Sequence, residues 1–571
     1  METMQIDKSR WCRILLWGCV LLAVTAMFFS SACGNARKQT ESDLVSFIMR
    51  YEREMVPVVE AINRTRWRFF ETGSLRYLST LDSLYGKRIE LLHDAKSFAY
   101  LKKTREKGEI KDAYLRRQVD ILYKEYLPCQ ASVGLQKRII RLDTYLHLET
   151  WNRLRKEEPN RLNVQGTSPA DVRFLQKNWE EWKKGGAAVA DSLLQLVRLR
   201  NRMAREAGYA DYFSMYLDLN EIRQSFMDSL VAELTQATDT VYRRQKEEKD
   251  RRLSARFSIP VSRLRPWHYS GALLRYGQYP NNHRKDGYYS YINIPSVADR
   301  FYSGIGFDIE DILARSNFLY WSEKIPAFEC IVAGNTNDIR IVGTISGTEN
   351  DMHRLMGATG KAIYLKYIPG TLPYLLRRPA SEALYCGVSA FFARMTQYPG
   401  WILSMGILSV GQAGGIRGST NEAFLHDQRL GCRWRLLLYA FEKQLYADPE
   451  QDLDALWYTM VGEYLQTDIR PPLENPWRAD WAAEPYFALY PCEVSNHLLG
   501  EMWAAQVVDY LCSGDCRLND RCDFNIVGNK SVGRFFERDI FASGAALNWE
   551  KLTETAMGKP LSIHAFVEQF K

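Results

Sequence analysis

The histidines decide first which metal chemistry the chain can carry out. In zinc peptidases one helix carries His-Glu-x-x-His: residues four apart share a helical face, so two imidazoles bind one ion, and the glutamate takes a proton from the metal-bound water. None of the eight histidines here is followed by glutamate, so this motif is absent from the whole sequence. The histidines are His93, His147, His268, His283, His353, His426, His497 and His564.

Three cysteines near the C-terminus form a second group capable of metal or redox chemistry: Cys512, Cys516 and Cys522. Zinc ribbons separate their paired cysteines by two intervening residues, and the spacings of this group do not match that pattern. Outside the cytoplasm, neighbouring cysteines commonly form a disulfide in a surface loop. We therefore expect a disulfide in this segment rather than a metal site.

The first 33 residues have the pattern of a secretory signal. Basic residues precede an apolar run from Ile14 to Phe29, and small residues then lead to Cys33. The run is shorter than the roughly 20 residues that a transmembrane helix needs. Small residues before a cysteine resemble a bacterial lipobox, although Ser30 stands where an aliphatic residue is usual. We expect residues 1–33 to be a lipoprotein signal, with the mature chain anchored to the membrane of a bacterial cell envelope through lipid on Cys33.

Composition and charge place the rest of the chain among globular proteins. Of its 571 residues, 46% are apolar and 25% are charged, which is ordinary for a folded protein. The net charge of +7 is small for this length. Because the sequence contains no basic stripe with interleaved aromatic residues, a nucleic-acid partner is not predicted.

Hydrophobic periodicity predicts the elements that must position any site. From Glu41 to about Arg256, apolar residues recur every three to four positions, which is typical of amphipathic helices. Residues 324–345 hold two short β-like runs around a turn, which predicts one hairpin. Helical patterning returns from Asp351 to the end. The predicted fold is therefore all-α with one short hairpin, in a single domain over residues 34–571.

Six segments of the sequence resemble the angiotensin-converting-enzyme family of zinc dipeptidyl carboxypeptidases, in the family's order and over nearly the whole chain after the signal. The resemblance implies two helical lobes around a deep cleft, with a zinc ion at the cleft floor and the hairpin near it. The family holds this zinc with the His-Glu-x-x-His helix and a glutamate from a following helix. The segments are Leu193–Leu217, Leu264–Tyr269, Phe301–Ser316, Tyr374–Phe392, Phe441–Val461 and Ala479–Gln506.

The same resemblance implies that the zinc site is degenerate. The segment Gly357–Tyr364 falls where the family has its zinc-binding helix, so that Gly357 replaces the first histidine, Ala358 the catalytic glutamate and Lys361 the second histidine. Cys386 stands where the family has its third ligand. Four changes together remove the metal, the activated water and the proton shuttle. We therefore expect no zinc cofactor and no catalytic residues.

The resemblance also marks residues that would line the retained cleft. Tyr486 stands where the family has an oxyanion-binding histidine, and Glu493 or Val494 stands near the companion tyrosine. A glutamate there would repel a developing oxyanion. Pro326 occupies the place of a substrate-contacting histidine. The predicted cleft residues are His353, Lys361, Glu382, Tyr385, Cys386, Tyr486 and Glu493.

Three interpretations of these cleft residues stay open at this point. Lys361 can replace the lost cation by pairing with Glu382 or with the thiol of Cys386. His353 can bind a metal with Cys386 and Glu382 in a displaced site. Cys386 can act as a nucleophile if Lys361 lowers the pKa of its thiol.

The function expected from this pattern is that of a catalytically inactive, peptidase-like lipoprotein that binds a peptide or protein segment in its cleft. Two alternatives come from other classes. One is an active metallopeptidase with a rearranged metal site. The other is a structural envelope scaffold whose cleft is closed.

Overall fold

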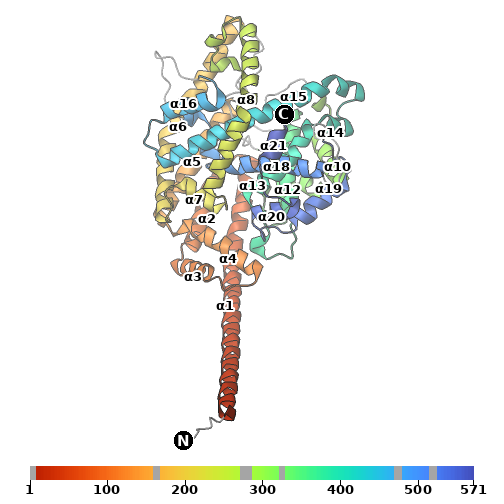
Figure 1. The fold of residues 1–571 in the computed structure, drawn as a ribbon. Helices are drawn as coiled ribbons and strands as arrows, with labels where there is room; N and C mark the ends of the chain where they lie inside the picture. The colour runs from red at the N-terminus through yellow and green to blue at the C-terminus, as the bar shows by residue number, and fades with distance from the viewer. Residues whose placement is uncertain are drawn as a thin grey trace, which may run out of the picture.

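A computed structural model gives the fold of the chain. It describes the backbone of residues 8–157, 168–269, 286–319, 328–468, 479–513 and 524–570; within these ranges, the side chains of residues 8–38, 155–157, 286, 410, 413–424 and 427 are not described. The described chain is predominantly helical and contains a single two-stranded sheet (Figure 1). The predicted all-α class with one hairpin is confirmed.

The first half of the chain forms eight described helices. α1 is long, and its N-terminal part projects from the body of the molecule (Figure 1). The predicted lipidation site Cys33 lies among the residues whose side chains are not described. Within the described residues, no helix combines the length and apolarity needed to cross a membrane. The helices are α1 (Lys8–Thr72), α2 (Arg76–Leu92), α3 (Ala95–Lys107), α4 (Ala113–Tyr126), α5 (Val133–Glu157), α6 (Pro169–Glu206), α7 (Tyr212–Leu219) and α8 (Gln224–Phe257).

The second half contains the hairpin and the remaining helices, several of them short. Helix α13 packs against both α12 and α18. The elements are α9 (Asp286–Tyr289), α10 (Ile294–Ile305), α11 (Glu310–Arg315), β1 (Glu329–Val332), β2 (Ile339–Val342), α12 (Glu349–Lys366), α13 (Glu382–Arg394), α14 (Pro399–Ser404), α15 (Val410–Ala447), α16 (Leu453–Leu465), α17 (Tyr486–Leu489), α18 (Val494–Ser513), α19 (Lys530–Phe535), α20 (Trp549–Met557) and α21 (His564–Glu568).

Polar caps fix where the two central helices begin. At the start of α12, the N–H of Asp351 donates to the hydroxyl of Thr348 at 3.1 Å, and the Asp351 carboxylate accepts from the Thr348 N–H at 3.0 Å. At the start of α13, the Ser381 hydroxyl accepts from the Leu384 N–H at 3.2 Å. Such caps satisfy N–H groups that have no partner inside the helix. They set the register of the helices that carry Lys361 and Cys386.

The hairpin has one edge that bonds to a further segment and one edge with which no described strand pairs. β1 pairs antiparallel with β2, and the Ala333 N–H donates to the Asp338 carbonyl at 2.7 Å beside the turn. On the far side of β2, the Asn317 N–H donates to the Ile341 carbonyl at 2.9 Å. Hydrogen-bonded pairs alternate along an antiparallel ladder, so Cys330 and Val332 direct their main-chain N–H and C=O away from β2. No described strand pairs with that edge of β1.

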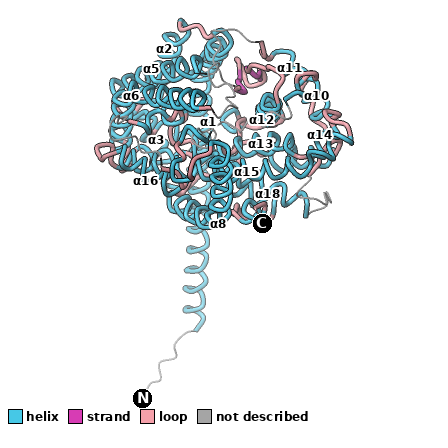
Figure 2. The backbone as a smooth tube through the Cα atoms, turned by 90° about the horizontal axis from the view of Figure 1, so that it is seen from above, coloured by secondary structure: helices cyan, strands magenta, loops and turns pink. Residues whose placement is uncertain are grey.

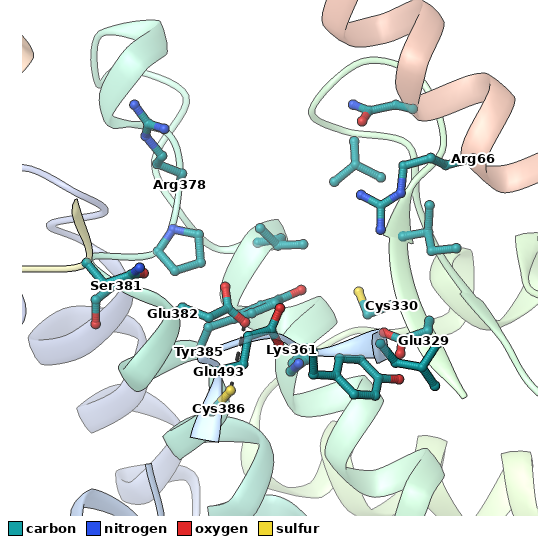
Figure 3. A pocket seen from close by; sticks show the side chains of 18 of the residues that line it. Arg66, Glu329, Cys330, Lys361, Arg378, Ser381, Glu382, Tyr385, Cys386 and Glu493 are labelled. Carbon is teal, nitrogen blue, oxygen red and sulfur yellow. Dashed lines mark hydrogen bonds between the residues drawn. The ribbon is translucent and has the colours of Figure 1, made fainter. Parts of the chain in front are cut away.

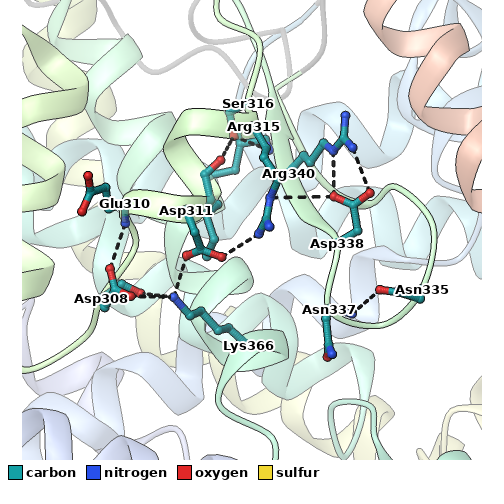
Figure 4. A network of polar contacts seen from close by, with 12 residues as sticks. Asp308, Glu310, Asp311, Arg315, Ser316, Asn335, Asn337, Asp338, Arg340 and Lys366 are labelled. Atoms are coloured by element: carbon teal, nitrogen blue, oxygen red, sulfur yellow. Dashed lines mark hydrogen bonds and ion pairs between the residues drawn. The ribbon is translucent and has the colours of Figure 1, made fainter.

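A network of charged side chains fastens the hairpin to the helices beside it (Figure 4). Arg340 on β2 makes a bidentate contact with Asp338 at 2.8 and 2.9 Å. Arg315 at the end of α11 lies 3.8 Å from Asp338 and 2.6 Å from Asp311. Lys366 at the end of α12 donates to Asp311 at 2.6 Å. The network joins α11, the hairpin and α12, so the position of β1 is fixed relative to Lys361.

The hairpin lies between the N-terminal and C-terminal halves of the molecule. Viewed from above, its strands are seen between α1 and α11 (Figure 2), and β1 contacts α1 while β2 contacts α11 and α12. On the α1 side, the Asn63 amide donates to the Gly334 carbonyl at 3.3 Å, and the Arg340 guanidinium lies 5.1 Å from the centre of the Trp67 ring. Among the described residues, one large core fills most of the body, a smaller core cluster underlies α1–α4, and four further clusters are smaller still.

Candidate functional site

A cavity of about 1180 Å³, called here the central cavity, lies between the two halves of the molecule. One wall comes from α1, α2, α4 and α5, and the other comes from β1, α12, α13, α17 and α18. Six of the seven predicted cleft residues line it: Lys361, Glu382, Tyr385, Cys386, Tyr486 and Glu493. The floor, drawn in Figure 3, is where Lys361, Glu382, Cys386 and Glu493 gather beneath Arg66 and Arg378.

The seventh predicted residue, His353, does not line the cavity, which corrects its placement. His353 is buried between α12 and the end of α13, where its Nδ1 lies 3.3 Å from the Thr396 hydroxyl. Burial lowers the pKa of His353 to about 4, so the ring is neutral at neutral pH. The physical reason for the error is that helical spacing predicts which residues share a face of α12, but it does not predict which other element packs on that face. The displaced metal site with Cys386 and Glu382 is not formed.

Gly357 and Ala358 also lie away from the cavity, in the contact between α12 and α13. A Cβ added to Gly357 would lie 2.9 Å from the Ser389 hydroxyl and 3.3 Å from the Ser389 carbonyl. Ala358 is 6% exposed and belongs to the main core. The helices therefore approach too closely at residue 357 for an imidazole to fit without displacing α13. The glycine here is a packing residue.

Lys361 faces the cavity but forms no direct ion pair with any described residue. Its Nζ lies 4.7 Å from the centre of the Tyr385 ring, a cation–π contact. Burial alone would lower the pKa of Lys361, but the nearby Cys386, Glu382 and Glu329 outweigh it and raise the pKa above its usual value. The predicted partners Glu382 and Cys386 are therefore close enough to act on the ammonium, which also lies over the Tyr385 ring.

Cys386 is placed as a neutral thiol. Its Sγ donates to the Glu382 carboxylate at 3.8 Å. Burial raises the pKa of Cys386; Lys361 opposes this increase, and Glu382 and Glu493 add to it, so that the pKa stays above its usual value. A thiol with a raised pKa carries little thiolate at neutral pH and is a poor nucleophile. The nucleophile interpretation of Cys386 is not supported by this geometry.

Glu493 is a carboxyl group on the cavity floor whose pKa is strongly raised. Burial, with Glu382 and Glu329 as further causes, raises the pKa of Glu493 to about 8, against the opposing effect of Lys361 and Arg66. Its side chain makes no hydrogen bond or ion pair with any described residue. At neutral pH the group is mostly protonated, and a nearby positive charge would ionise it.

Sequence reasoning missed four residues of the floor: Arg66, Glu329, Cys330 and His497. Arg66 comes from α1, and Glu329 and Cys330 come from β1, so only the tertiary fold brings them to α13. His497 lies one helical turn after Glu493, and that spacing was a usable signal. Burial, with Arg435 and Lys361 as further causes, lowers the pKa of His497 to about 3. Its ring lies edge-on to Tyr486 at 6.3 Å between centres and is neutral.

The residues present do not fit the zinc ion that the resemblance implies. Gly357 and Ala358 supply no ligand atom, Lys361 would place a positive charge beside the metal, and Cys386 keeps its proton. Among the described residues, no group of three or more His, Cys, Asp or Glu side chains is arranged to hold a metal ion. Pro326, Cys516 and Cys522 lie outside the described residues, so the predictions that involve them stay predictions.

Comparison with known proteins does not assign the chain to a family. The resemblance to the angiotensin-converting-enzyme family therefore rests on the six segments and on the order in which they occur. No family model matches the sequence, and no curated protein matches it at a significant level.

Proposed function

We propose that this protein binds a peptide or protein segment in its central cavity without hydrolysing it, as an inactive relative of the zinc dipeptidyl carboxypeptidases. The observation that carries the proposal is the large cavity whose floor holds Lys361 and Cys386. The resemblance aligns these two residues with zinc ligands of the family. Its volume is slightly above the usual range for sites that bind small ligands. An open cavity favours ligand binding over a scaffold whose cleft is closed.

The edge of β1 supports an extended ligand. Cys330 and Val332 line the cavity, and their main-chain N–H and C=O groups point away from β2. An exposed strand edge is a template on which an extended peptide can add as a further strand. Main-chain bonds of this kind bind many sequences, while pockets beside the strand select particular side chains.

The chemistry of the floor argues against hydrolysis of the bound segment. A peptidase needs an activated nucleophile and a donor that stabilises the oxyanion. The general base position is held by Ala358, and the Cys386 thiol stays protonated because its pKa is raised. Glu493 stands near the position of an oxyanion donor, and it becomes negative as the pH rises. Binding and catalysis are therefore separable at this site.

The first prediction is that the purified protein contains no stoichiometric zinc. It also states that bound peptides slow hydrogen–deuterium exchange in β1. Randomised heptapeptides should slow hydrogen–deuterium exchange in residues 329–332, because added main-chain bonds shield Cys330 and Val332. Mass spectrometry of the same mixture should find the peptides intact, and elemental analysis should find zinc well below one ion per chain. About one zinc per chain, or cleaved peptides, would contradict the proposal, as would unchanged exchange in β1.

The proposal includes a lipid anchor at Cys33, which gives a second prediction. Replacing Cys33 with alanine should release the chain from membranes into the aqueous fraction, because the attached lipid would supply most of the membrane affinity. The matched control is Cys19→Ala, which changes a cysteine inside the apolar run and should leave the chain with the membranes. Quantitative retention of the Cys33→Ala protein in detergent and membrane fractions would show that no lipid on Cys33 is needed.

A further inference from the structure

The carboxylates that line the central cavity fall into two groups. Away from the floor, each is matched by a cation: Glu125 accepts from Arg378 at 2.9 Å, and Glu221 accepts from Lys124 at 3.2 Å and from Arg117. On the floor, none of the glutamates forms an ion pair with a described residue. These floor glutamates are Glu329, Glu382 and Glu493.

The contacts of the floor glutamates leave most of their acceptor capacity unused. The thiol of Cys386 donates to Glu382 at 3.8 Å, and this is the one side-chain hydrogen bond to any of the three within the described chain. Figure 3 shows Glu382 and Glu493 on one side of the floor, with Glu329 across from them on β1. The three side chains come from α13, from the start of α18 and from the hairpin, so their convergence is a property of the tertiary fold.

Two cations face this group, and neither is bound to a carboxylate in the described chain. Lys361 places its ammonium over the Tyr385 ring at 4.7 Å. Arg66 points toward Glu329 from α1 (Figure 3). The other titratable groups that interact with these carboxyl groups are mostly uncharged near neutral pH. Burial lowers the pKa of His497 and raises that of Cys386, Cys330, Tyr385, Tyr216 and Glu442, the last to about 8.

The charges on the floor therefore depend on the state of Glu493. With Glu493 protonated, two carboxylates face two cations and the floor is balanced. With Glu493 ionised, the floor carries one excess negative charge. A ligand that brings one positive charge restores the balance, so the proton on Glu493 and a cationic ligand group are alternatives.

We propose that the floor of the central cavity is a subsite for a cationic group of the bound segment, a primary ammonium or a guanidinium, that contacts Glu493 together with Glu382 and Glu329. This subsite deepens the proposed function and rests on it. The main chain of the segment lies along β1, and its positive group reaches down to the floor. A negative ligand group would meet three carboxyl groups there and is excluded.

Binding of the cation moves one proton. As the ligand ammonium approaches, the carboxyl of Glu493 gives its proton to solvent and becomes the anionic partner. Because the pKa of Glu493 is about 8, the ionised fraction rises from about a tenth at pH 7 to about nine tenths at pH 9, and affinity for a permanently cationic group should rise roughly tenfold. A lysine side chain stays charged over this range, whereas an N-terminal amine loses its charge.

Equilibrium dialysis of the full chain against four heptapeptide pools tests the subsite. Every pool is randomised except at its central residue. Three pools are acetylated and amidated, and their central residue is lysine in the first, norleucine in the second and glutamate in the third. The fourth pool has a central norleucine and a free N-terminus. The lysine pool should be retained roughly tenfold more than the acetylated norleucine pool at pH 9. The affinity of the lysine pool should increase from pH 7 to pH 9. Any stronger retention of the pool with a free N-terminus, relative to the acetylated norleucine pool, should decrease over the same range.

Glu493→Gln removes the charge with little change of shape. At pH 9 this variant should retain the lysine pool at most about twofold more than the acetylated norleucine pool. Glu537→Gln, at an exposed glutamate outside the cavity, is the matched control and should keep the preference. Thermal unfolding shows whether each variant is folded. Equal retention of all pools, or a preference for glutamate, would refute the cationic subsite while leaving peptide binding intact. If no pool is retained, the proposed function itself is wrong.

Discussion

Replacing Lys183 with methionine should lower the free energy of unfolding by about 3–5 kcal/mol, because it leaves a buried carboxylate without its cation. Lys183 lies on α6 and forms an ion pair with Asp480, and the two side chains are 5% and 3% exposed. The ammonium also lies 4.5 Å from the centre of the Trp179 ring. Methionine keeps the length and apolar stem of lysine, so the lost charge dominates the effect.

The neighbouring residue on the same helix supplies the control for this variant. Lys184 pairs with Glu181 at 2.8 Å, but the two side chains are 66% and 59% exposed, so Lys184→Met should change stability little. Urea unfolding of both variants, followed by circular dichroism, measures the difference. Lys183→Met combined with Asp480→Asn should recover part of the loss, since no buried charge remains. Equal effects of Lys183→Met and Lys184→Met would show that Asp480 is not buried as described.

The loss in Lys183→Met should also depend on pH. Burial is the largest influence on Asp480 and raises its pKa above the usual value, although Lys183 opposes the increase. An acid whose pKa is higher in the folded state binds its proton more tightly there, so it lowers stability as the pH rises through its unfolded pKa. Without Lys183 this effect grows. The variant should therefore approach the original protein in stability as the pH falls, and diverge from it toward neutral pH.

This ion pair matters to the cavity because of where Asp480 stands. It begins the turn Asp480–Ala483, which packs on α6 and leads into α17. The backbone of Ala483 lies so close to Gly186 that a side chain at residue 186 would collide with it. α17 carries Tyr486, which lines the cavity. The pair thus holds one edge of the cavity wall against a helix from the other half of the sequence.

The parts of the fold that depend on local sequence were predictable. Apolar spacing predicted the helices, and residues 324–345 predicted a hairpin whose strands are found at Glu329–Val332 and Ile339–Val342. Both signals are periodicities within one element, so they need no knowledge of the neighbours. Six of the seven predicted cleft residues line one cavity. They were chosen from the resemblance and not from a helical face, since Tyr486 lies on the short helix α17 and Glu493 lies just before α18.

The parts that failed depend on which elements touch. His353 and Lys361 lie on the same helix, but the end of α13 covers the first and leaves the second facing the cavity. Glu329 and Arg66 meet across the floor from β1 and α1, and no spacing in the sequence links them. Lys361 forms no ion pair with a described residue, and its ammonium lies over the ring of Tyr385. Tyr385 and Glu382 were both predicted cleft residues, but the sequence does not show which of them the ammonium contacts.

Gly500→Ala should lower the free energy of unfolding by about 2–4 kcal/mol, although it adds only a methyl group. Gly500 lies on α18 where that helix meets α13. The added Cβ would lie 2.8 Å from the Gly387 nitrogen and 3.0 Å from the backbone carbon of Cys386. Backbone atoms of a buried helix cannot rotate aside as a flexible side chain can, so α13 and α18 must separate.

The control for Gly500→Ala is Gly462→Ala on α16. No heavy atom lies within 4 Å of a Cβ built at Gly462, and alanine favours a helix over glycine by about 0.5–1 kcal/mol. The two substitutions are chemically identical, so any difference between them comes from the surroundings. Denaturant unfolding should show a lower free energy of unfolding for Gly500→Ala and a higher one for Gly462→Ala. Because α13 carries Glu382 and Cys386 while α18 begins beside Glu493, separating the helices should also weaken the preference for cationic peptides. Equal and small effects of both variants would show that α13 and α18 are not in backbone contact, and would remove the physical basis for placing these floor groups together.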